Sequence, residues 1–379
     1  MLRVLTAGES HGKLLQATLD GFPAGLKIDT DFINTELKRR QGGYGRGGRQ
    51  KLETDVVDIQ TGIWQGVTVG SPITLAVPNA DFKLERLKEL ERPRPGHGDL
   101  TGAIKYLGSI RGILERASAR ETAVRVAAGA LCHLLLKQFG IEVFGFVTRL
   151  ESIPTTPRTG TLAELRALRD ASPMYTLDPD TDPAICARVD EATAQGDTLG
   201  GIVEVRVFNL PFGLGSHAQW DRKLDGLLAQ AVMSIQAIKG VEVGLGFEAA
   251  HRPGSKVHDE IAYDADLADT PGLGYVRSTN NAGGLEAGMT NGQPLIIRAA
   301  MKPISTLRKP LDSINLQTKE PERAAYERSD VCALAACSVI VENVVAQTIA
   351  TAFIEKFGGD SLLEMQARYE LFHDLARQR

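Results

Sequence analysis

Two histidines of the chain stand in glycine-rich surroundings that suit proton transfer. His11 lies in "GESHG" (Gly8–Gly12), and His97 lies in "RPRPGHGD" (Arg92–Asp99). Histidine titrates near ~6.5 and can give or take a proton at neutral pH. The neighbouring glycines leave each imidazole open to a ligand. A solvated turn histidine is the alternative for His11, so the pattern indicates two candidate acid–base residues without fixing the reaction.

A basic segment offers a site for anions. The stretch "RRQGGYGRGGRQK" (Arg39–Lys51) contains four arginines, one lysine and five glycines, although the whole chain has a net charge of -4. Arginine binds carboxylates and phosphates through two parallel hydrogen bonds, and glycines let a loop close over a ligand. The alternative is a Gly/Arg RNA-binding segment, but only Tyr44 offers a stacking face there. We expect this segment to bind small anionic ligands.

The stretch "LERASARE" (Leu114–Glu121) indicates a second anion site. Ser118 and Glu121 have the spacing of a capping box, which predicts a helix N-terminus at this point. Free backbone N–H groups at a helix start attract phosphate, particularly beside Arg116 and Arg120. A plain helix cap is the alternative interpretation.

The segment "MKPISTLRKP" (Met301–Pro310) adds a lysine and two hydroxyls, and its prolines predict a loop or a sheet edge. It suits a phosphate or the edge of a ring. Familiar nucleotide motifs are incomplete elsewhere: "GESHGKL" lacks the spacing of a phosphate loop, and "GLGFEA" (Gly244–Ala249) has no surrounding βαβ unit. The histidines show no metal-ligand spacing, so we expect no protein-bound metal.

The composition is that of an ordinary globular protein. Hydrophobic residues make up 43% of the 379 residues and charged residues 24%, which is sufficient for a sizeable core. The net charge of -4 argues against general nucleic-acid binding. No signal-peptide pattern is present, and the most apolar stretch, Val331–Val341, is interrupted by Glu342 and Asn343. We therefore expect a cytoplasmic protein with a buried helix at this position and no membrane association.

The cysteines are Cys132, Cys186, Cys332 and Cys337. They form no C-x-x-C pair and lie in apolar or helical surroundings. We expect buried free thiols in a reducing compartment.

An internal repeat predicts how the elements are organised. Three blocks occur twice in the same order, with offsets of 188, 222 and 212 positions. The pairs are Gly8–Leu26 with Gly196–Leu214, Gly62–Ile73 with Gly284–Leu295, and Glu115–Ala130 with Glu327–Glu342. Each half contains a turn-bounded strand, a glycine-rich hairpin and a long helix. We predict one domain over residues 1–379, with related halves at about 1–140 and 196–358 joined by a pseudo-twofold, and an inserted segment at about 150–195.

The predicted fold class is α+β. The stretches "LQATLDGF" and "GIVEVRVFNL" alternate as strands do, and the order of elements does not follow the short βαβ rhythm of a parallel sheet. We expect antiparallel sheets with helices packed between or over them. The two halves differ at His11, whose counterpart is Leu199, and at Ser118, whose counterpart is Asp330. Asp330 is either a helix N-cap or a positioned carboxylate.

Seven motifs together resemble the chorismate synthase family. They are "GESHG", "YGRGGRQ", "RPGHGDLTG", "ERASARET", "NGQPL", "MKPISTL" and "ERSD". The resemblance implies a carbon–oxygen lyase with a β-α-β sandwich fold and a homotetrameric assembly. Its reaction would be a reduced-FMN-dependent 1,4-anti-elimination of phosphate from 5-enolpyruvylshikimate-3-phosphate. The product is chorismate, at the last common step of the shikimate pathway to aromatic amino acids, with no net redox change.

The resemblance also implies roles for single residues. His11 would be the acid beside the departing phosphate, His97 the proton partner of the reduced flavin, and Asp330 the carboxylate that assists proton removal. The residues implied for the substrate are Arg40, Arg46 and Arg49, with Arg94 and Arg120 as further candidates. In members that also reduce flavin with NADPH, that nucleotide would compete at Arg40 and Arg46.

The residues implied for FMN are Arg116, Ala117, Ser118, Gln236, Ala237, Ala287, Lys302, Pro303, Ile304, Ser305, Thr306 and Arg328. Two of them depart from the family pattern: Ala117 stands where serine is common, and Ala287 stands where glycine is common. The chain has no long insertion of the kind expected of self-reducing members. We therefore expect an external flavin reductase, with NADPH a candidate reductant. A simple flavin-binding module and an NADPH:flavin oxidoreductase are the alternatives.

Overall fold

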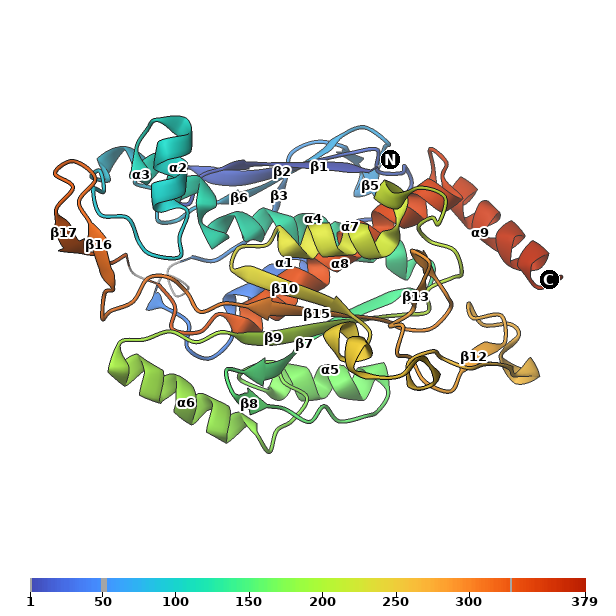
Figure 1. Cartoon of the computed structure of the whole chain (residues 1–379). Helices are drawn as coiled ribbons and strands as arrows, with labels where there is room; N and C mark the ends of the chain where they lie inside the picture. Colours follow the sequence, from blue (N-terminus) through green and yellow to red (C-terminus); the bar gives the residue numbers. More distant parts are fainter. Residues whose placement is uncertain (1, 49–52, 328) are drawn as a thin grey trace.

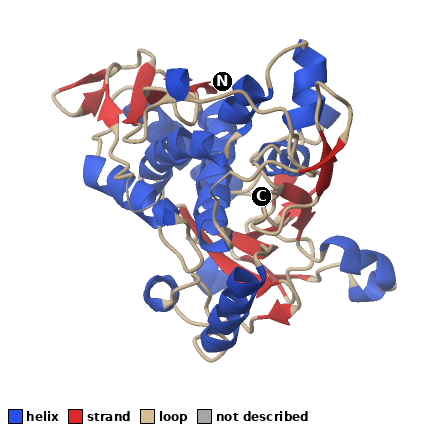
Figure 2. Ribbon diagram, turned by 90° about the vertical axis from the view of Figure 1, so that its left-hand side faces the viewer, coloured by secondary structure: helices blue, strands red, loops and turns tan. Residues whose placement is uncertain are grey.

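The computed structural model describes residues 2–48, 53–327 and 329–379 of the chain. In this part of the chain two antiparallel sheets enclose a layer of helices (Figure 1). The first sheet has the strand order β1-β2-β6-β3, and the second has the order β10-β15-β9-β7-β8. Figure 2 shows a group of helices in the middle of the molecule and further helices at its edges. The predicted α+β sandwich of antiparallel sheets and helices is confirmed.

The first sheet consists of β1 (Arg3–Gly8), β2 (Leu14–Asp20), β3 (Asp58–Ile59) and β6 (Ile73–Pro78). The second consists of β7 (Glu142–Leu150), β8 (Ile153–Pro154), β9 (Gly201–Phe208), β10 (Ile238–Val243) and β15 (Leu295–Met301). Between them lie α1 (Thr30–Gln41), α4 (Thr122–Lys137), α7 (Leu224–Met233) and α8 (Leu334–Phe357). Outside this layer are α2 (Asp99–Tyr106), α3 (Ile110–Ala117), α5 (Leu162–Ala171), α6 (Asp182–Gln195) and α9 (Leu362–Ala376).

Short two-stranded ribbons complete the described fold. They are β4–β5 (Ile63–Trp64 and Val67–Thr68), β11–β12 (Ile261–Tyr263 and Tyr275–Arg277), β13–β14 (Leu285–Glu286 and Met289–Thr290), and β16–β17 (Asp312–Ile314 and Pro321–Arg323).

Helices α4 and α8 form the centre of the helical layer and pack directly against each other. Each is buried on nearly all sides, which is typical of an apolar core helix. Among the described helices, α8 alone is long and apolar enough to cross a membrane, yet 83% of its most apolar stretch is buried inside the protein. The predicted buried helix after Val331 is confirmed. It continues through Glu342 and Asn343, which are buried within it.

A buried ionic network ties α1 to α8. Arg39 binds Glu36 through Nη1 at 2.7 Å and Glu342 through Nη2 at 2.8 Å. The Nδ2 of Asn343 donates to Glu36 at 3.0 Å. Burial raises the pKa of Glu36, but the Arg39 charge and hydrogen bonds lower it more, to a net value of about 2. The first arginine of the basic segment therefore belongs to the core and does not face a ligand.

The repeated blocks have the same strand register in both halves. In the first sheet Leu19 of β2 pairs with Ile73 of β6. At the offsets of 188 and 222, the equivalent pair in the second sheet is Val207 of β9 with Leu295 of β15. Helices α4 and α8 likewise begin at positions 212 apart. The repeat is thus visible in the pairing of the backbone.

A threonine makes the same two hydrogen bonds in each half. The hydroxyl of Thr68 accepts from the backbone N–H of Leu26 at 2.9 Å and donates to the carbonyl of Pro23 at 2.7 Å. The hydroxyl of Thr290 accepts from the N–H of Leu214 at 2.8 Å and donates to the carbonyl of Pro211 at 2.6 Å. All three positions match at the sequence offsets. We propose on this basis that residues 1–379 form a single domain with related halves at about 1–140 and 196–358.

The segment proposed as an insertion, about 150–195, lies beside the second sheet (Figure 1). Its first helix, α5, begins with a complete capping box between Thr161 and Glu164, as the sequence predicts. Leu165 of this helix packs against Phe144 and Phe146 of β7. The segment thus covers apolar side chains on the sheet face that points away from α4 and α8.

The cysteines of the chain are free thiols. Cys132, Cys332 and Cys337 are buried, and burial raises their pKa values to about 12, 11 and 12. Cys186 is only partly buried, which corrects the expectation for that residue. No described cysteine therefore combines an exposed thiol with a lowered pKa, which a nucleophile would need.

The close approach of α4 and α8 generates a stability prediction. A methyl group at Gly129 would clash with the carbonyl oxygen of Asn343, so one helix must shift to admit it. We expect Gly129→Ala to destabilise the protein by about 1–3 kcal/mol, despite the better helix propensity of alanine. Gly226 in α7 has open space around it. Gly226→Ala is the matched control and should leave the protein equally or more stable.

Thermal unfolding of the two variants beside the unchanged protein measures this difference. An unchanged melting temperature for Gly129→Ala would show that the two helices do not pack as closely as described.

Candidate active site

A cavity of about 400 Å³ lies at the N-terminal ends of α4 and α8, where loops of both halves meet. It collects most of the residues that the sequence singled out. The predicted residues that line it are His11, Arg40, Arg46, Arg94, His97, Ala117, Ser118, Arg120, Gln236, Ala237, Lys302, Ile304, Ser305, Thr306 and Asp330. Arg49 and Arg328 lie outside the described residues. The structure thus brings together side chains separated by up to 319 positions (His11 to Asp330).

Three predicted residues do not line the cavity. Arg116, in the last turn of α3, donates instead to the carbonyl oxygens of Gly8 at 3.1 Å and Thr6 at 3.0 Å. Pro303 belongs to the cavity loop but does not face it. Ala287 stands in the β13–β14 turn with a φ of 52°, a left-handed conformation that favours glycine.

The expected capping box at Ser118 is wrong. The Ser118 hydroxyl accepts from the backbone N–H of Arg120 at 3.3 Å and starts a short 3₁₀ helix, Ala119–Glu121. Helix α4 then begins at Thr122 without a side-chain cap. The residues before α4 form a 3₁₀ turn, which is tighter than the first turn of an α-helix. The Ser118 hydroxyl therefore accepts from the N–H two positions on, and not from the N–H three positions on that a capping box uses.

Two buried arginines that line the cavity share one carboxylate, Asp55. Asp55 binds Nη1 of Arg120 at 2.6 Å and Nη1 of Arg40 at 3.2 Å. The Nε of Arg40 also donates to the hydroxyl of Thr122 at 3.0 Å, and the Nε of Arg120 donates to Asn79 at 2.8 Å. Burial lowers the pKa of Arg40 to about 10, although Asp55 opposes the shift. Both guanidinium groups are therefore held in fixed directions before a ligand binds.

Asp330 binds the basic segment. Its Oδ2 pairs with Nη1 of Arg46 at 3.1 Å, and its Oδ1 accepts from the backbone N–H of Gly47 at 2.6 Å. Helix α8 begins at Leu334 after the cap position Ala333. Asp330 is therefore a positioned carboxylate and not the helix N-cap.

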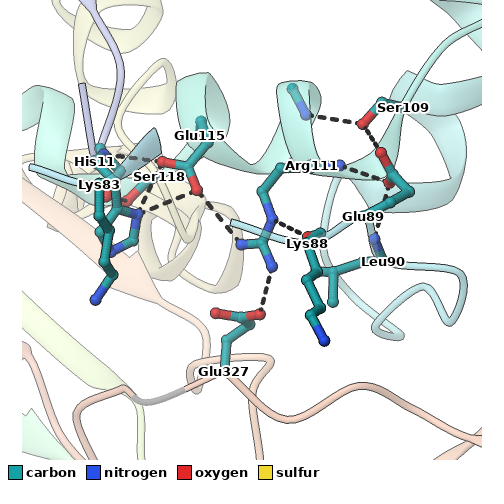
Figure 3. A network of polar contacts seen from close by, with 12 residues as sticks. His11, Lys83, Lys88, Glu89, Leu90, Ser109, Arg111, Glu115, Ser118 and Glu327 are labelled. Atoms are coloured by element: carbon teal, nitrogen blue, oxygen red, sulfur yellow. Dashed lines mark hydrogen bonds and ion pairs between the residues drawn. The ribbon is translucent and has the colours of Figure 1, made fainter. Parts of the chain in front are cut away.

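His11 is held by Glu115 of α3 (Figure 3). The Nδ1 of His11 lies 2.9 Å from Oε2 of Glu115, and the backbone N–H of His11 donates to the same oxygen at 2.9 Å. The Nε2 of His11 lies 3.7 Å from Oδ2 of Asp81. Burial raises the pKa of Glu115, but the hydrogen bonds and charge of His11 lower it more, so that the net shift is downward. Glu115 is thus an ionised partner for the ring.

Arg111 extends this network towards the cavity. It binds Oε1 of Glu115 at 3.4 Å and Oε1 of Glu327, a cavity residue, at 3.1 Å (Figure 3). Arg111 therefore links Glu115, which binds His11, to Glu327, which lies three positions before Asp330.

His97 is held by Asp99, the first residue of α2. The Nδ1 of His97 lies 2.5 Å from Oδ1 of Asp99, whose side chain is fully buried. Arg94 binds the same carboxylate through Nε at 2.8 Å and donates through Nη1 to the hydroxyl of Thr306 at 2.9 Å. Burial alone would raise the pKa of Asp99. The hydrogen bonds and charges of His97 and Arg94 have a larger effect in the opposite direction, so the net shift of this pKa is downward. One buried carboxylate thus orients a histidine and an arginine together.

Further polar groups are available to a ligand. The Oε1 of Gln236 and the Nε of Arg46 are buried and have no hydrogen-bond partner among the described residues. Burial, with the charge of Lys239, lowers the pKa of Lys302. Because a buried polar group without a partner costs free energy, these atoms are suited to a polar ligand. The described residues contain no cluster of histidine, cysteine or acidic side chains that could hold a metal ion.

Comparison with known proteins decides the family. The family model described as chorismate synthase matches residues 2–354. The chorismate synthase of Geobacter metallireducens is 54% identical over 391 residues, and that of Geobacter sulfurreducens is 53% identical over 392, in each case covering 100% of both chains. A solved structure titled "Crystal Structure of Chorismate Synthase" matches with a TM-score of 0.81 and 40% identity, covering 100% of this chain and 99% of that one.

The chain belongs to the chorismate synthase family. Its activity is that of a carbon–oxygen lyase, which eliminates phosphate from 5-enolpyruvylshikimate-3-phosphate to give chorismate. This substrate carries two carboxylates and a phosphate. The cavity described above, with its five cationic side chains, matches that charge.

Three carboxylates that the sequence did not single out hold predicted site residues. They are Asp55, Asp99 and Glu115. Asp99 stands two positions after His97, so the local order "HGD" was an available signal. Asp55 and Glu115 meet their partners across 65 and 104 positions, and no local pattern reveals those contacts.

Two arginines of the same basic segment should respond differently to removal. Arg39→Ala leaves Glu36 and Glu342 buried without their cation, and we expect it to cost about 3–5 kcal/mol of unfolding free energy. Arg46→Ala should lose less stability but raise the KM for 5-enolpyruvylshikimate-3-phosphate about tenfold to hundredfold, since a charged hydrogen bond contributes about 1.5–3 kcal/mol. Denaturant titration and steady-state kinetics of both variants measure the contrast.

The loss in Arg39→Ala should depend on pH. The folded pKa of Glu36, about 2, lies below the unfolded value near ~4.3, so its stabilisation is complete above ~4.3 and is lost as the pH falls towards about 2. The stability difference between the two proteins should shrink over that window. A difference that stays constant or grows would place Arg39 outside the network.

Proposed function

We propose that the cavity binds 5-enolpyruvylshikimate-3-phosphate together with reduced FMN and that the elimination takes place there without net redox change. One observation supports this most strongly: two histidines and five cations line the same cavity. The cations are Arg40, Arg46, Arg94, Arg120 and Lys302, against Glu53, Glu327 and Asp330 as the acidic lining residues. A cavity of this charge attracts a ligand with three anionic groups.

The residues present fit FMN. Oε1 of Gln236 is a buried acceptor without a partner among the described residues, and it suits a ring N–H group. Lys302 and the hydroxyls of Ser305 and Thr306 line the cavity from one loop and suit a phosphate or ring edge. Ala237 has a φ of 69°, so its loop keeps a strained turn against the cavity. When bound, reduced FMN supplies electron density as the allylic phosphate departs.

We propose the substrate role for Arg40, Arg46, Arg49, Arg94 and Arg120. The proposed FMN site consists of Ala117, Ser118, Gln236, Ala237, Lys302, Pro303, Ile304, Ser305 and Thr306, with Arg116, Ala287 and Arg328. For Arg49, Arg116, Ala287, Pro303 and Arg328 this proposal rests on the family resemblance alone.

His11 is the proposed acid beside the departing phosphate. Carboxylates lie near both of its ring nitrogens, Glu115 at Nδ1 and Asp81 at Nε2. Because Glu115 binds Nδ1, Nε2 is the nitrogen positioned to give a proton in the proposed role. His97 is the proposed proton partner of the reduced flavin. Because Asp99 binds its Nδ1 and the residue lines the cavity, its Nε2 is the nitrogen left for proton exchange.

Asp330 is the proposed carboxylate that assists proton removal. In the free protein both of its oxygens are engaged, by Arg46 and by the N–H of Gly47. A substrate carboxylate or phosphate that binds Arg46 would compete for this guanidinium. The carboxylate of Asp330 would then be available for its role in the reaction.

Assembly and cellular setting complete the proposal. We propose a homotetramer in the cytoplasm, supplied with reduced FMN by an external flavin reductase and with NADPH as a candidate reductant. Large apolar side chains are exposed in the single chain, among them Leu107 at 91%, Trp220 at 76% and Phe247 at 75%. Exposed apolar groups of this size support burial between copies. The mass measured by light scattering tests the assembly.

An anaerobic assay tests the proposed flavin requirement. It compares reduced FMN, oxidised FMN and no flavin with 5-enolpyruvylshikimate-3-phosphate as substrate. We expect chorismate only with reduced FMN and no net consumption of reductant. Equal rates without flavin, or consumption of one reductant per turnover, would contradict the proposal.

A histidine variant tests the proton role. His97→Ala should still bind FMN, but its kcat should fall by about 10²–10⁴, the usual contribution of a positioned acid or base. His258→Ala removes an exposed histidine away from the cavity and is the control. Flavin binding measured by fluorescence and kcat measured anaerobically separate the two effects. A kcat unchanged from that of the control would remove His97 from proton transfer.

A further inference from the structure

We propose that Asp99 and Glu115 are positioning residues that fix the tautomers of the two cavity histidines. Each carboxylate binds Nδ1 of one ring, so that Nε2 is the atom left to exchange a proton in the cavity. The part of these histidines in the reaction rests on the proposed function. The tautomers themselves can be measured without turnover.

The contact between His97 and Asp99 requires a proton on Nδ1. A ring nitrogen without a proton and a carboxylate oxygen are both acceptors, and they do not approach to 2.5 Å. The Nη2 of Arg94 also lies 3.0 Å from Nδ1, but it donates to the same Asp99 oxygen at 3.0 Å. Since a guanidinium has no acceptor atom, Asp99 is the one acceptor for the Nδ1 proton in this group.

The Asp99 carboxylate is itself fixed. Its Oδ2 accepts from the backbone N–H of Arg94 at 3.0 Å and from its Nε at 2.8 Å. The same arginine is held by the hydroxyl of Thr306 from the other half of the chain. The carboxylate therefore cannot rotate away from the ring without breaking a buried ion pair. Its position sets the direction of the imidazole.

The contact between His11 and Glu115 has the same form on a different element. Both Glu115 oxygens lie close to Nδ1, at 2.9 and 3.1 Å, and the side chain of Glu115 is fully buried. The backbone N–H of His11 and the guanidinium of Arg111 hold the same carboxylate. Among the described residues, the Nε2 side of the ring has the longer contact to Asp81 at 3.7 Å. The shorter contact at Nδ1 therefore sets the tautomer, and Nε2 is the nitrogen left for proton exchange.

Such carboxylate–histidine pairs act in enzymes by holding one tautomer and one orientation, and removing the charge without changing the shape is costly for turnover. Asp99→Asn and Glu115→Gln keep the size of the side chain and replace an acceptor oxygen by an amide. An amide that donates to Nδ1 favours the proton on Nε2. Each variant should therefore reverse the tautomer of one ring and leave the other unchanged.

The experiment is ¹⁵N NMR of the full-length protein with labelled histidine, at a pH above the range in which histidine titrates. His97→Gln and His11→Gln assign the two signals by their absence. We expect both rings to carry the proton on Nδ1 in the unchanged protein. Asp99→Asn should move the proton to Nε2 in His97 alone, and Glu115→Gln should do so in His11 alone. Asp259→Asn, a carboxylate that binds backbone N–H groups remote from the cavity, should change neither signal.

Anaerobic kinetics complete the test. We expect Asp99→Asn and Glu115→Gln to lower kcat about 10²–10⁴-fold, with a smaller change in KM. A proton on Nε2 in the unchanged protein, or a tautomer that does not respond to these variants, would overturn the inference. If Asp99→Asn does not fold, the unchanged protein and Glu115→Gln still decide it. The expected tautomers combined with an unaltered kcat in His97→Gln would instead contradict the proposed function and leave the positioning contacts intact.

Discussion

A guanidinium group that is buried before its ligand arrives must have a partner, and the site depends on this requirement. An uncompensated buried charge would cost several kcal/mol, and each described arginine that lines the cavity, buried or partly buried, is paired with a carboxylate. The pairs are Arg40 and Arg120 with Asp55, Arg94 with Asp99, and Arg46 with Asp330. The same rule holds in the core, where Arg39 bridges two glutamates. The acidic residues of the site are thus a consequence of its basic ones.

This pairing gives the free protein a preorganised site. Asp55 and Asp99 hold three guanidinium groups in fixed directions, so a trianionic ligand meets donors that need little reordering. Asp330 differs because its partner, Arg46, comes from the glycine-rich segment and keeps one Nε–H without a partner among the described residues. Under the proposed function, a substrate anion that binds Arg46 would replace Asp330 on this guanidinium. The arrival of substrate would then release the carboxylate.

The arrangement of the two related halves brings the paired arginines and carboxylates to one cavity. Helices α4 and α8 occupy equivalent positions in the two halves, and their N-terminal ends meet the same cavity. The equivalent positions Ser118 and Asp330 therefore both face the cavity, one with a hydroxyl and one with a carboxylate. His11 has Leu199 as its counterpart, a buried residue in the second half. The residues proposed for the chemistry, such as His11 and Asp330, thus lie at positions where the two related halves differ.

The sequence predicted the parts of the molecule that depend on local signals. Glycines with positive φ mark the turns of the repeat, and Gly66 and Gly288 follow equivalent left-handed residues, Gln65 and Ala287, at the offset of 222. Glycines around His11 and His97 likewise revealed both histidines. The opposite fates of neighbouring arginines were not visible, because they depend on which face of α1 each residue occupies. Arg39 turns to the core, and Arg40 turns to the cavity.

Carboxylate partners were the main omission from the sequence analysis. Glu115 meets His11 across 104 positions, and Asp55 meets Arg120 across 65, so only the folded chain joins them. The predicted capping box at Ser118 was wrong for a different reason. A 3₁₀ turn precedes α4, and the residue pattern does not distinguish such a turn from the first turn of an α-helix. Pairings over such distances are decided by the packing of the layers.

A crystal structure of the complex with 5-enolpyruvylshikimate-3-phosphate and FMN would show which anion each arginine binds. We expect both ligands in the cavity, with a substrate anion on Arg46 in place of Asp330 and Nε2 of both histidines facing the ligands. Asp55 and Asp99 should keep their arginines. Ligands bound elsewhere, or an Arg46–Asp330 pair that stays at 3.1 Å beside bound substrate, would contradict it.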